Sequence, residues 1–136
     1  MTRRGQDSLL SEATRRFLLD RVVTVERLNV LLLLHRHANR WWDAPALASE
    51  LEMPAEAVQL HLEHLSARSL LDVRIAESVI YCYKPAGEEL AKNVEEATRA
   101  HYYHRDAVAA VLSNRPGDTA RLFADAFRLR KDKQDG

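Results

Sequence analysis

The fold of this chain is decided by residues 45–71, which read PALASELEMPAEAVQLHLEHLSARSLL. Apolar residues recur at helical spacing in both halves of this stretch: Leu47, Ala48 and Leu51, then Val58, Leu62 and Leu65. The turn Glu52-Met53-Pro54 separates the halves, and Leu70-Leu71 closes the apolar pattern. Two helices joined by a tight turn, with their apolar faces together, predict a helix-turn-helix.

The residues that follow alternate in the manner of a β-hairpin. Residues 71–75 (LDVRI) and 79–84 (VIYCYK) are rich in β-branched and aromatic side chains, which favour strands. The segment Ala76-Glu77-Ser78 separates them and is short enough to form the turn. We therefore expect two antiparallel strands directly after the helix-turn-helix.

Together, the helix-turn-helix and the hairpin resemble the winged helix-turn-helix domains of bacterial transcription regulators of the MarR and ArsR kind, over about residues 24–85. The resemblance implies a mainly α fold with a small β-hairpin, the wing, and the apolar periodicity outside it adds extra N-terminal and long C-terminal helices. It also implies a short strand at Trp41-Trp42 that pairs with the wing, while one large ring covers the edge of the core. These families usually carry glycine in the turn and before the final leucine pair, where this chain has Glu52 and Ser69. Either Glu52 adopts the left-handed conformation itself or the turn differs.

Helical periodicity continues on both sides of the motif. An amphipathic helix is expected over residues 8–22, and a buried central helix over residues 24–38, built on VLLLL and capped by Thr24. A long helix is expected over residues 88–113 and a last one over residues 119–131. The chain then divides into an N-terminal arm and helix (1–23), the winged domain (24–86), C-terminal helices (87–131) and a polar tail (132–136).

Composition indicates a globular protein of the cytoplasm. The 136 residues suit one core, and 46% hydrophobic with 29% charged residues is typical of soluble domains. Cys82 is the single cysteine, which excludes a disulfide framework. The longest apolar run is too short to span a membrane, and residues 1–10 lack the apolar segment of a secretion signal.

The resemblance also implies a DNA interface, because in these families the second helix of the motif enters the major groove. When its aliphatic residues face inward, the outward positions are Ala55, Glu56, Gln59, Leu60 and Glu63. An outward glutamine is suited to read adenine. Four further residues are expected to touch the DNA backbone: Arg40 before the short strand, and Arg74, Ser78 and Lys84 on the wing.

The charge of the motif suggests a different partner. Twenty basic and twenty acidic residues cancel over the chain, and residues 45–71 hold four carboxylates against Arg68 alone. Because lysine and arginine supply most of the affinity for DNA, an acidic recognition helix is a poor groove reader. The alternative is a winged-helix adaptor that docks a partner protein through Glu56, Leu60 and Glu63.

Residues 88–113 carry an apolar stripe that is broader than a single winged domain can bury. The surplus must meet the N-terminal helix, the last helix or a second copy of the chain. We expect a homodimer in which the stripe contributes to the contact. Its members are Leu90, Val94, Ala97, His101, Val108 and Leu112.

Metal binding and catalysis find little support in the residues. ArsR-like sensors place zinc ligands on terminal helices, where this chain has His101, His104 and Asp106. Two histidines one turn apart fall short of the three or four ligands that zinc requires, so no metal or other cofactor is expected. A Gly-rich phosphate loop and a nucleophile elbow are both absent from the sequence, and we expect no enzyme.

Overall fold

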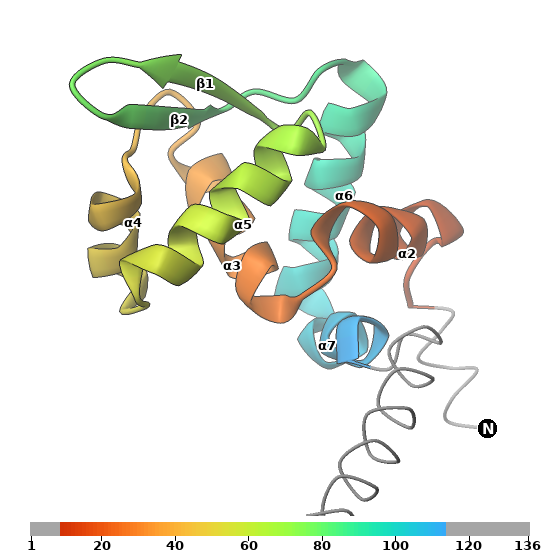
Figure 1. Ribbon diagram of the computed structural model, residues 1–136. Coiled ribbons are helices and arrows are strands. Elements are labelled where there is room, and N and C mark those ends of the chain that lie inside the picture. The colour runs from red at the N-terminus through yellow and green to blue at the C-terminus, as the bar shows by residue number, and fades with distance from the viewer. Residues whose placement is uncertain (1–8, 114–136) are drawn as a thin grey trace, which may run out of the picture.

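A computed structural model describes residues 9–113 of the chain (Figure 1). Its elements, in order, are α2 (Glu12–Phe17), the π-helical turn η1 (Leu18–Val22), α3 (Val25–Arg36), α4 (Ala44–Leu51), α5 (Ala55–Ala67), β1 (Leu71–Ile75), β2 (Val79–Tyr83), α6 (Glu88–Tyr103) and α7 (Arg105–Ser113). The helix-turn-helix is α4 and α5, and the wing is β1 and β2. This is the mainly α winged helix-turn-helix that the sequence predicted. The predicted arm over residues 1–8, last helix and polar tail lie outside the described residues.

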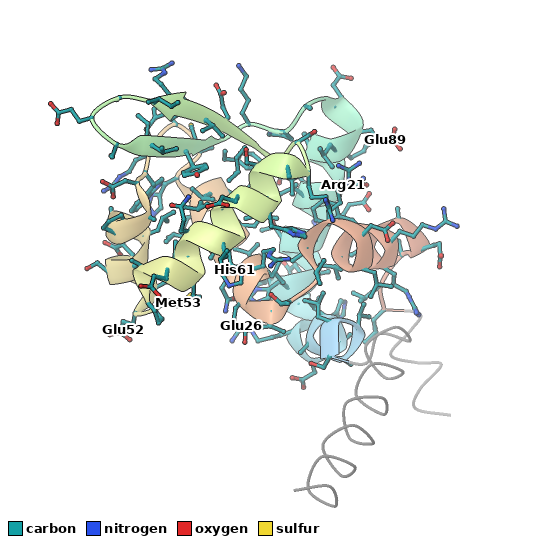
Figure 2. All side chains as sticks on the ribbon, in the orientation of Figure 1. Arg21, Glu26, Glu52, Met53, His61 and Glu89 are labelled. Atoms are coloured by element: carbon teal, nitrogen blue, oxygen red, sulfur yellow. The ribbon has the colours of Figure 1, made fainter. Side chains whose placement is uncertain are left out.

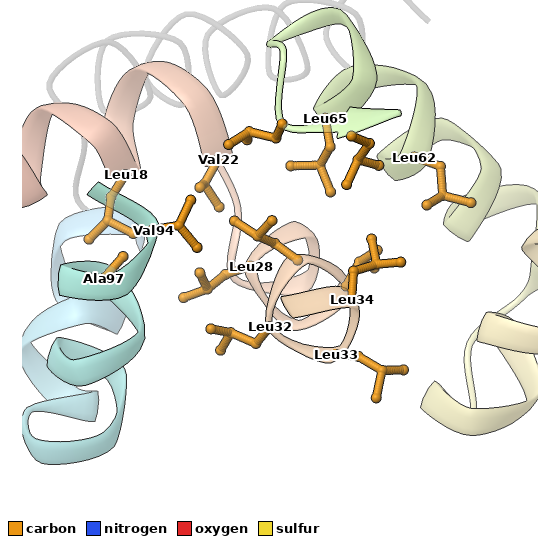
Figure 3. Packing of buried hydrophobic residues seen from close by; sticks show 14 of the residues in the cluster. Leu18, Val22, Leu28, Leu32, Leu33, Leu34, Leu62, Leu65, Val94 and Ala97 are labelled. Carbon is orange, nitrogen blue, oxygen red and sulfur yellow. The ribbon is translucent and has the colours of Figure 1, made fainter. Parts of the chain in front are cut away.

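The core is built around α3. Its VLLLL segment is buried on nearly all sides, between α5 on one face and η1 and α7 on another. Figure 3 shows Leu62 and Leu65 of α5 pointing toward Leu28 and Leu34 of α3. All four side chains are at most 1% exposed. Burying each such leucine contributes about 2 kcal/mol, so this contact fixes the orientation of α5.

Of the two possibilities for the turn of the motif, a left-handed Glu52 or a different turn, the structure has the first. Glu52 itself adopts the left-handed conformation at the end of α4, with φ 54° and ψ 47°. The amide of Met53 then donates to the carbonyl of Ala48 at 3.0 Å, which satisfies the end of the helix. Ser69 stands at the second expected glycine position and is also left-handed, with φ 67°.

The N-terminal helix is shorter and less regular than predicted. It begins at Glu12, because the Ser11 hydroxyl caps it by accepting from the amide of Thr14 at 3.0 Å. Leu9, which the predicted helix over residues 8–22 included, precedes the observed helix and is 47% exposed. From Leu18 the hydrogen bonds reach five residues back, and the π turn ends at Val23 with φ 81°.

The long C-terminal helix was also predicted wrongly, because it breaks at His104. The backbone there has φ −138° and ψ 52°, which ends α6 at Tyr103 and lets α7 start at Arg105. The break turns α7 back toward η1 and α3, where Val108 and Leu112 are buried. A straight helix would have left these side chains in water, and their burial favours the bend.

The wing and the segment before α4 match the expectation. The two strands are antiparallel, with Leu71 opposite Tyr83 and Ile75 opposite Val79. Trp42 forms an isolated bridge with Tyr81, and its side chain is 2% exposed, as expected of a ring that covers the core. None of the helices within residues 9–113 has both the length and the apolar character needed to cross a membrane.

We expect Glu52→Gly to raise the free energy of unfolding by about 1 kcal/mol, because glycine adopts the left-handed conformation without the strain of a Cβ. Glu50→Gly, at an exposed helical position of α4, should instead lower it by about 0.8 kcal/mol. Urea unfolding of both variants measures this. Changes of the same sign in the two variants would contradict the left-handed turn.

Candidate nucleic-acid interface

The buried residues of α5 determine which of its residues face outward. Val58, Leu62 and Leu65 are fully buried, so the residues on the opposite side of the helix face solvent. Of the five predicted outward residues, Ala55, Glu56, Leu60 and Glu63 are exposed, and Gln59 is half-buried. Leu60 is 65% exposed, which places a large apolar side chain at the centre of this face.

Gln59 connects α5 to the wing. Its side-chain nitrogen donates to the hydroxyl of Tyr81 on β2 at 3.0 Å and to the carboxylate of Glu63 at 2.8 Å. Both amide hydrogens therefore have acceptors within the protein. To read adenine, as the sequence suggested, Gln59 would have to release at least one of these bonds.

Two arginines gather on the tryptophan pair. The guanidinium of Arg40 lies 3.8 Å from the centre of the Trp42 ring, and that of Arg74 lies 4.4 Å from the centre of the Trp41 ring. Cation–π contact orients both side chains while leaving each arginine exposed. Both arginines were predicted as contacts from the sequence, but the tryptophans that hold them were not. The neighbouring positions of Arg40, Trp41 and Trp42 were the available signal.

The other two predicted contacts lie at opposite ends of the wing. Ser78 is exposed in the turn, where its carbonyl accepts from the amide of Ala76 at 2.9 Å. Lys84 follows β2 at the base, where its amide donates to the carbonyl of Leu70 at 3.0 Å. Between them the wing exposes apolar side chains, with Ile75 at 83%. Ser78 therefore lies at the free end of the wing, and Lys84 lies next to the helical core.

The candidate interface has acidic side chains on one part and basic side chains on another. The turn and outward face of α5 present Glu52, Glu56 and Glu63, and Figure 2 shows Glu52 at the turn that precedes the helix. The segment before α4 and the wing present Arg40 and Arg74. Glu56 also lies in the first turn of α5, where a carboxylate favours the positive end of the helix dipole. Its charge thus stabilises the helix and opposes a phosphate.

Cys82 has the surroundings of a structural residue rather than of a reactive one. Cys82 is buried, and its thiol donates to the carbonyl of Ala38 at 3.2 Å. Burial, followed by the charge of Asp72, raises the pKa of Cys82, which keeps the thiol neutral. Within residues 9–113, no group of three or more histidine, cysteine or acidic side chains is arranged to hold a metal ion.

Four of the six predicted dimerisation residues lie inside the core of a single chain: Val94, Ala97, Val108 and Leu112. The break in the C-terminal helix accounts for Val108 and Leu112, because it lets α7 pack on η1 and α3, while α6 packs on α2. Figure 3 shows Val94 and Ala97 facing Leu18 of η1. The other two, Leu90 and His101, are half-buried. Their pairing with a second copy stays a prediction.

Comparison with known proteins adds to this geometry. No family model and no curated protein matches the chain. Sco5413, a MarR family transcriptional regulator from Streptomyces coelicolor, is 18% identical and has a TM-score of 0.54, covering 98% of this chain and 91% of that chain. Reduced HlyU from Vibrio cholerae is 21% identical, with a TM-score of 0.49 over 76% of this chain and 98% of that chain. The adhesin competence repressor AdcR from Streptococcus pyogenes is 15% identical, with a TM-score of 0.49 over 100% and 99%.

At such low identities the likeness concerns the fold and not the function, and the match to Sco5413 carries it. That match extends over nearly the whole of both chains, including the helices around the motif as well as the motif itself. The chain therefore has the winged helix-turn-helix fold of the MarR family regulator Sco5413, and the resemblance drawn from its sequence is confirmed for the fold.

Proposed function

We propose that the chain is a DNA-binding transcriptional regulator, active in the cytoplasm and without enzymatic activity. The observation that supports this best is the exposed face of α5 beside a wing that carries Arg74. In winged helix-turn-helix proteins the corresponding helix lies in the major groove, and its exposed side chains meet base edges. The outward face of α5 would lie in the groove, and Arg40, Arg74 and Ser78 would contact the backbone.

We also propose that the regulator acts as a homodimer. Three large apolar side chains are exposed near the junction of α6 and α7: Leu9, Tyr102 and Tyr103. The two tyrosines are 78% and 68% exposed, and their rings lie 4.9 Å apart. Together with the half-buried His101 at the same end of α6, they would form a surface for a second copy, while Leu90 lies at the other end of α6. A second α5 would then meet the next major groove of the same duplex.

An acidic α5 face also supports a second candidate, the adaptor that docks a partner protein. The specific observation is Leu60, which is 65% exposed between the carboxylates of Glu56 and Glu63. An exposed apolar surface with polar residues at its rim is typical of protein interaction sites. The two candidates differ in one measurable property, because the adaptor should not bind duplex DNA even at low salt.

The main test is the binding of fluorescent genomic duplexes at several salt concentrations. We expect affinity that falls steeply with salt, and Arg74→Ala should reduce the slope of log K against log salt by about 0.9, the value for one lost phosphate contact. Arg99→Ala, at an exposed site on α6, should leave the slope unchanged. Absence of binding at low salt would favour the adaptor instead.

The carboxylates of α5 give a second prediction. Glu56→Gln should raise DNA affinity about two- to fivefold, because it removes a charge that repels phosphate at an exposed site. Glu89→Gln is the matched control, since Glu89 is also an exposed residue in the first turn of a helix, α6 (Figure 2). Both changes should cost similar small amounts of stability. Equal DNA affinity of the two variants would place Glu56 outside the interface.

The homodimer predicts a molar mass of twice 15.5 kDa in size-exclusion chromatography with light scattering. Tyr102→Asp and Tyr103→Asp together should shift the mass toward that of one chain, because charges at an apolar contact oppose burial. A single-chain mass for the unchanged protein at micromolar concentration would contradict the dimer.

A further inference from the structure

Arginines connect α5 to the N-terminal helices through neutral acceptors. Arg21 of η1 donates to the carbonyl of Arg68, which follows α5, at 2.6 Å. Arg68 donates in return to the carbonyl of Asp20 at 3.3 Å. Figure 2 shows Arg21 and His61 along the side of α5 that faces the N-terminal helices. Positive charge therefore accumulates at this junction, because carbonyls accept hydrogen bonds without neutralising the guanidinium groups.

A third arginine contact, from Arg27 to His61, determines the protonation state of the histidine. The Nε of Arg27, on α3, donates to the Nδ1 of His61, on α5, at 3.1 Å. A guanidinium can only donate, so Nδ1 of His61 must carry a lone pair and the ring must be neutral. Protonation of this nitrogen would oppose two N–H groups and place a second positive charge beside the first. The contact between α3 and α5 therefore requires an uncharged His61.

His64 lies one turn further along α5 and has the same requirement for a different reason. Its Nε2 is buried and finds no hydrogen-bond partner among residues 9–113. Adding a proton there would create a buried charged donor without an acceptor, which is costly. The ring also faces the positive charges of Arg27 and Arg68, while a hydrogen bond to the backbone of Arg21 favours its protonated form.

The electrostatics of the junction agree with this geometry. Burial, followed by the charge of Arg27, lowers the pKa of both His61 and His64. Arg68 and His61 lower the pKa of His64 further. Glu26 at the start of α3 opposes the effect on His61 by favouring the charged ring, but its influence is the smallest of the three.

We propose that His61 and His64 form an acid-sensitive latch, which holds α5 against α3 and η1 while both rings are neutral and releases it when they are protonated. The latch would regulate the DNA site, because α5 is the helix that presents it, and only this last step rests on the proposed function. The signal it would sense is a fall in pH below the ordinary range of histidine titration.

The latch also includes the strained turn between η1 and α3. Arg27 donates through Nη1 to the carbonyl of Val22 at 3.3 Å, immediately before Val23 with its positive φ of 81°. A β-branched residue rarely adopts this conformation and does so only where its surroundings enforce it. Loss of the acceptor on His61 would free Arg27 and weaken its hold on this turn, so that release of α5 would extend to the start of α3.

The direction of the pH effect follows from linkage. A lowered pKa in the folded state means that the unfolded chain binds more protons once the pH falls below about 6.5. The stabilisation from the neutral rings is thus complete above that pH. It is lost as the pH falls toward the lowered pKa values of the folded protein. For each histidine, the folding equilibrium constant should fall up to about tenfold per pH unit in this window.

The direct test is to follow the imidazole nitrogens of the unchanged protein by NMR. At about pH 7.5 the Nδ1 of His61 should be unprotonated, and both rings should titrate below about 6.5. This measurement needs no substitution, so it stands even where a variant folds poorly. A protonated Nδ1 on His61 at about pH 7.5, or ordinary titration of both rings, would overturn the proposal.

The variant that tests release is His61→Asn with His64→Asn. Asparagine can place its amide oxygen, an acceptor, at the position of Nδ1 and does not titrate, so the hydrogen bond from Arg27 can persist at low pH. Urea unfolding between about pH 7.5 and about pH 5 should show a smaller loss of stability in the double variant than in the unchanged protein. The control is His37→Asn at an exposed site, which should behave as the unchanged protein does. The same pH dependence in the double variant would contradict the latch.

DNA binding then distinguishes a failure of the latch from a failure of the proposed function. With both correct, the unchanged protein loses affinity for duplex DNA at about pH 5 relative to the double variant. If neither protein binds DNA at any pH while the titration and unfolding results hold, the proposed function fails and the latch stands. If both bind DNA with the same pH dependence, α5 is not released and the latch fails.

Discussion

The packing of α5 against α3 is the constraint on which the rest of the structure depends. Leu62 and Leu65 are fully buried against α3, and their position on the helix decides which residues face outward. A rotation of α5 by one residue would expose a leucine and bury the carboxylate of Glu63 or the ring of His61. Both changes are costly, so the aliphatic contact selects the outward face as well as the inward one. The chemistry that this face offers is therefore a consequence of the core.

Polar contacts complete the placement of α5 at its two edges. On one edge Gln59 donates to the hydroxyl of Tyr81, which ties the helix to the wing. On the other edge His61 accepts from Arg27, which ties it to α3. The two edges differ in chemistry, because the wing contact joins an amide to a phenol, while the α3 contact ends on an imidazole whose pKa is lowered by burial and by Arg27. A change in pH would thus act on one edge of α5 and leave the other intact.

Much of the fold could be predicted from the sequence, because periodic aliphatic spacing and strand alternation are local signals. The turn at Glu52 could be narrowed to two forms but not decided, since a left-handed glutamate costs energy that only the surrounding contacts offset. The helix boundary at Val23 was predicted, but its positive φ and the π turn before it were not. The break at His104 was missed, because this position lacks the proline or glycine that usually marks a break. At the site, the outward positions were predicted, but the partners of Gln59, Arg40 and Arg74 were not. Tyr81, the partner of Gln59 on the wing, and Trp41, the partner of Arg74, come from distant segments, which sequence spacing does not reveal. Trp42 stands two residues after Arg40, so that contact had a local signal.

The most direct test of DNA binding through α5 and the wing is a titration of the isotopically labelled protein with a short duplex at low salt. Amide NMR spectra monitor each step of the titration. The account predicts that shifts concentrate on the first half of α5 around Glu56 and Leu60, and on the wing around Arg74 and Ser78. It predicts small changes for the amides of Leu62 and Leu65, whose side chains face the core. Shifts centred on α6 and α7, or an unchanged spectrum at every DNA concentration, would contradict it.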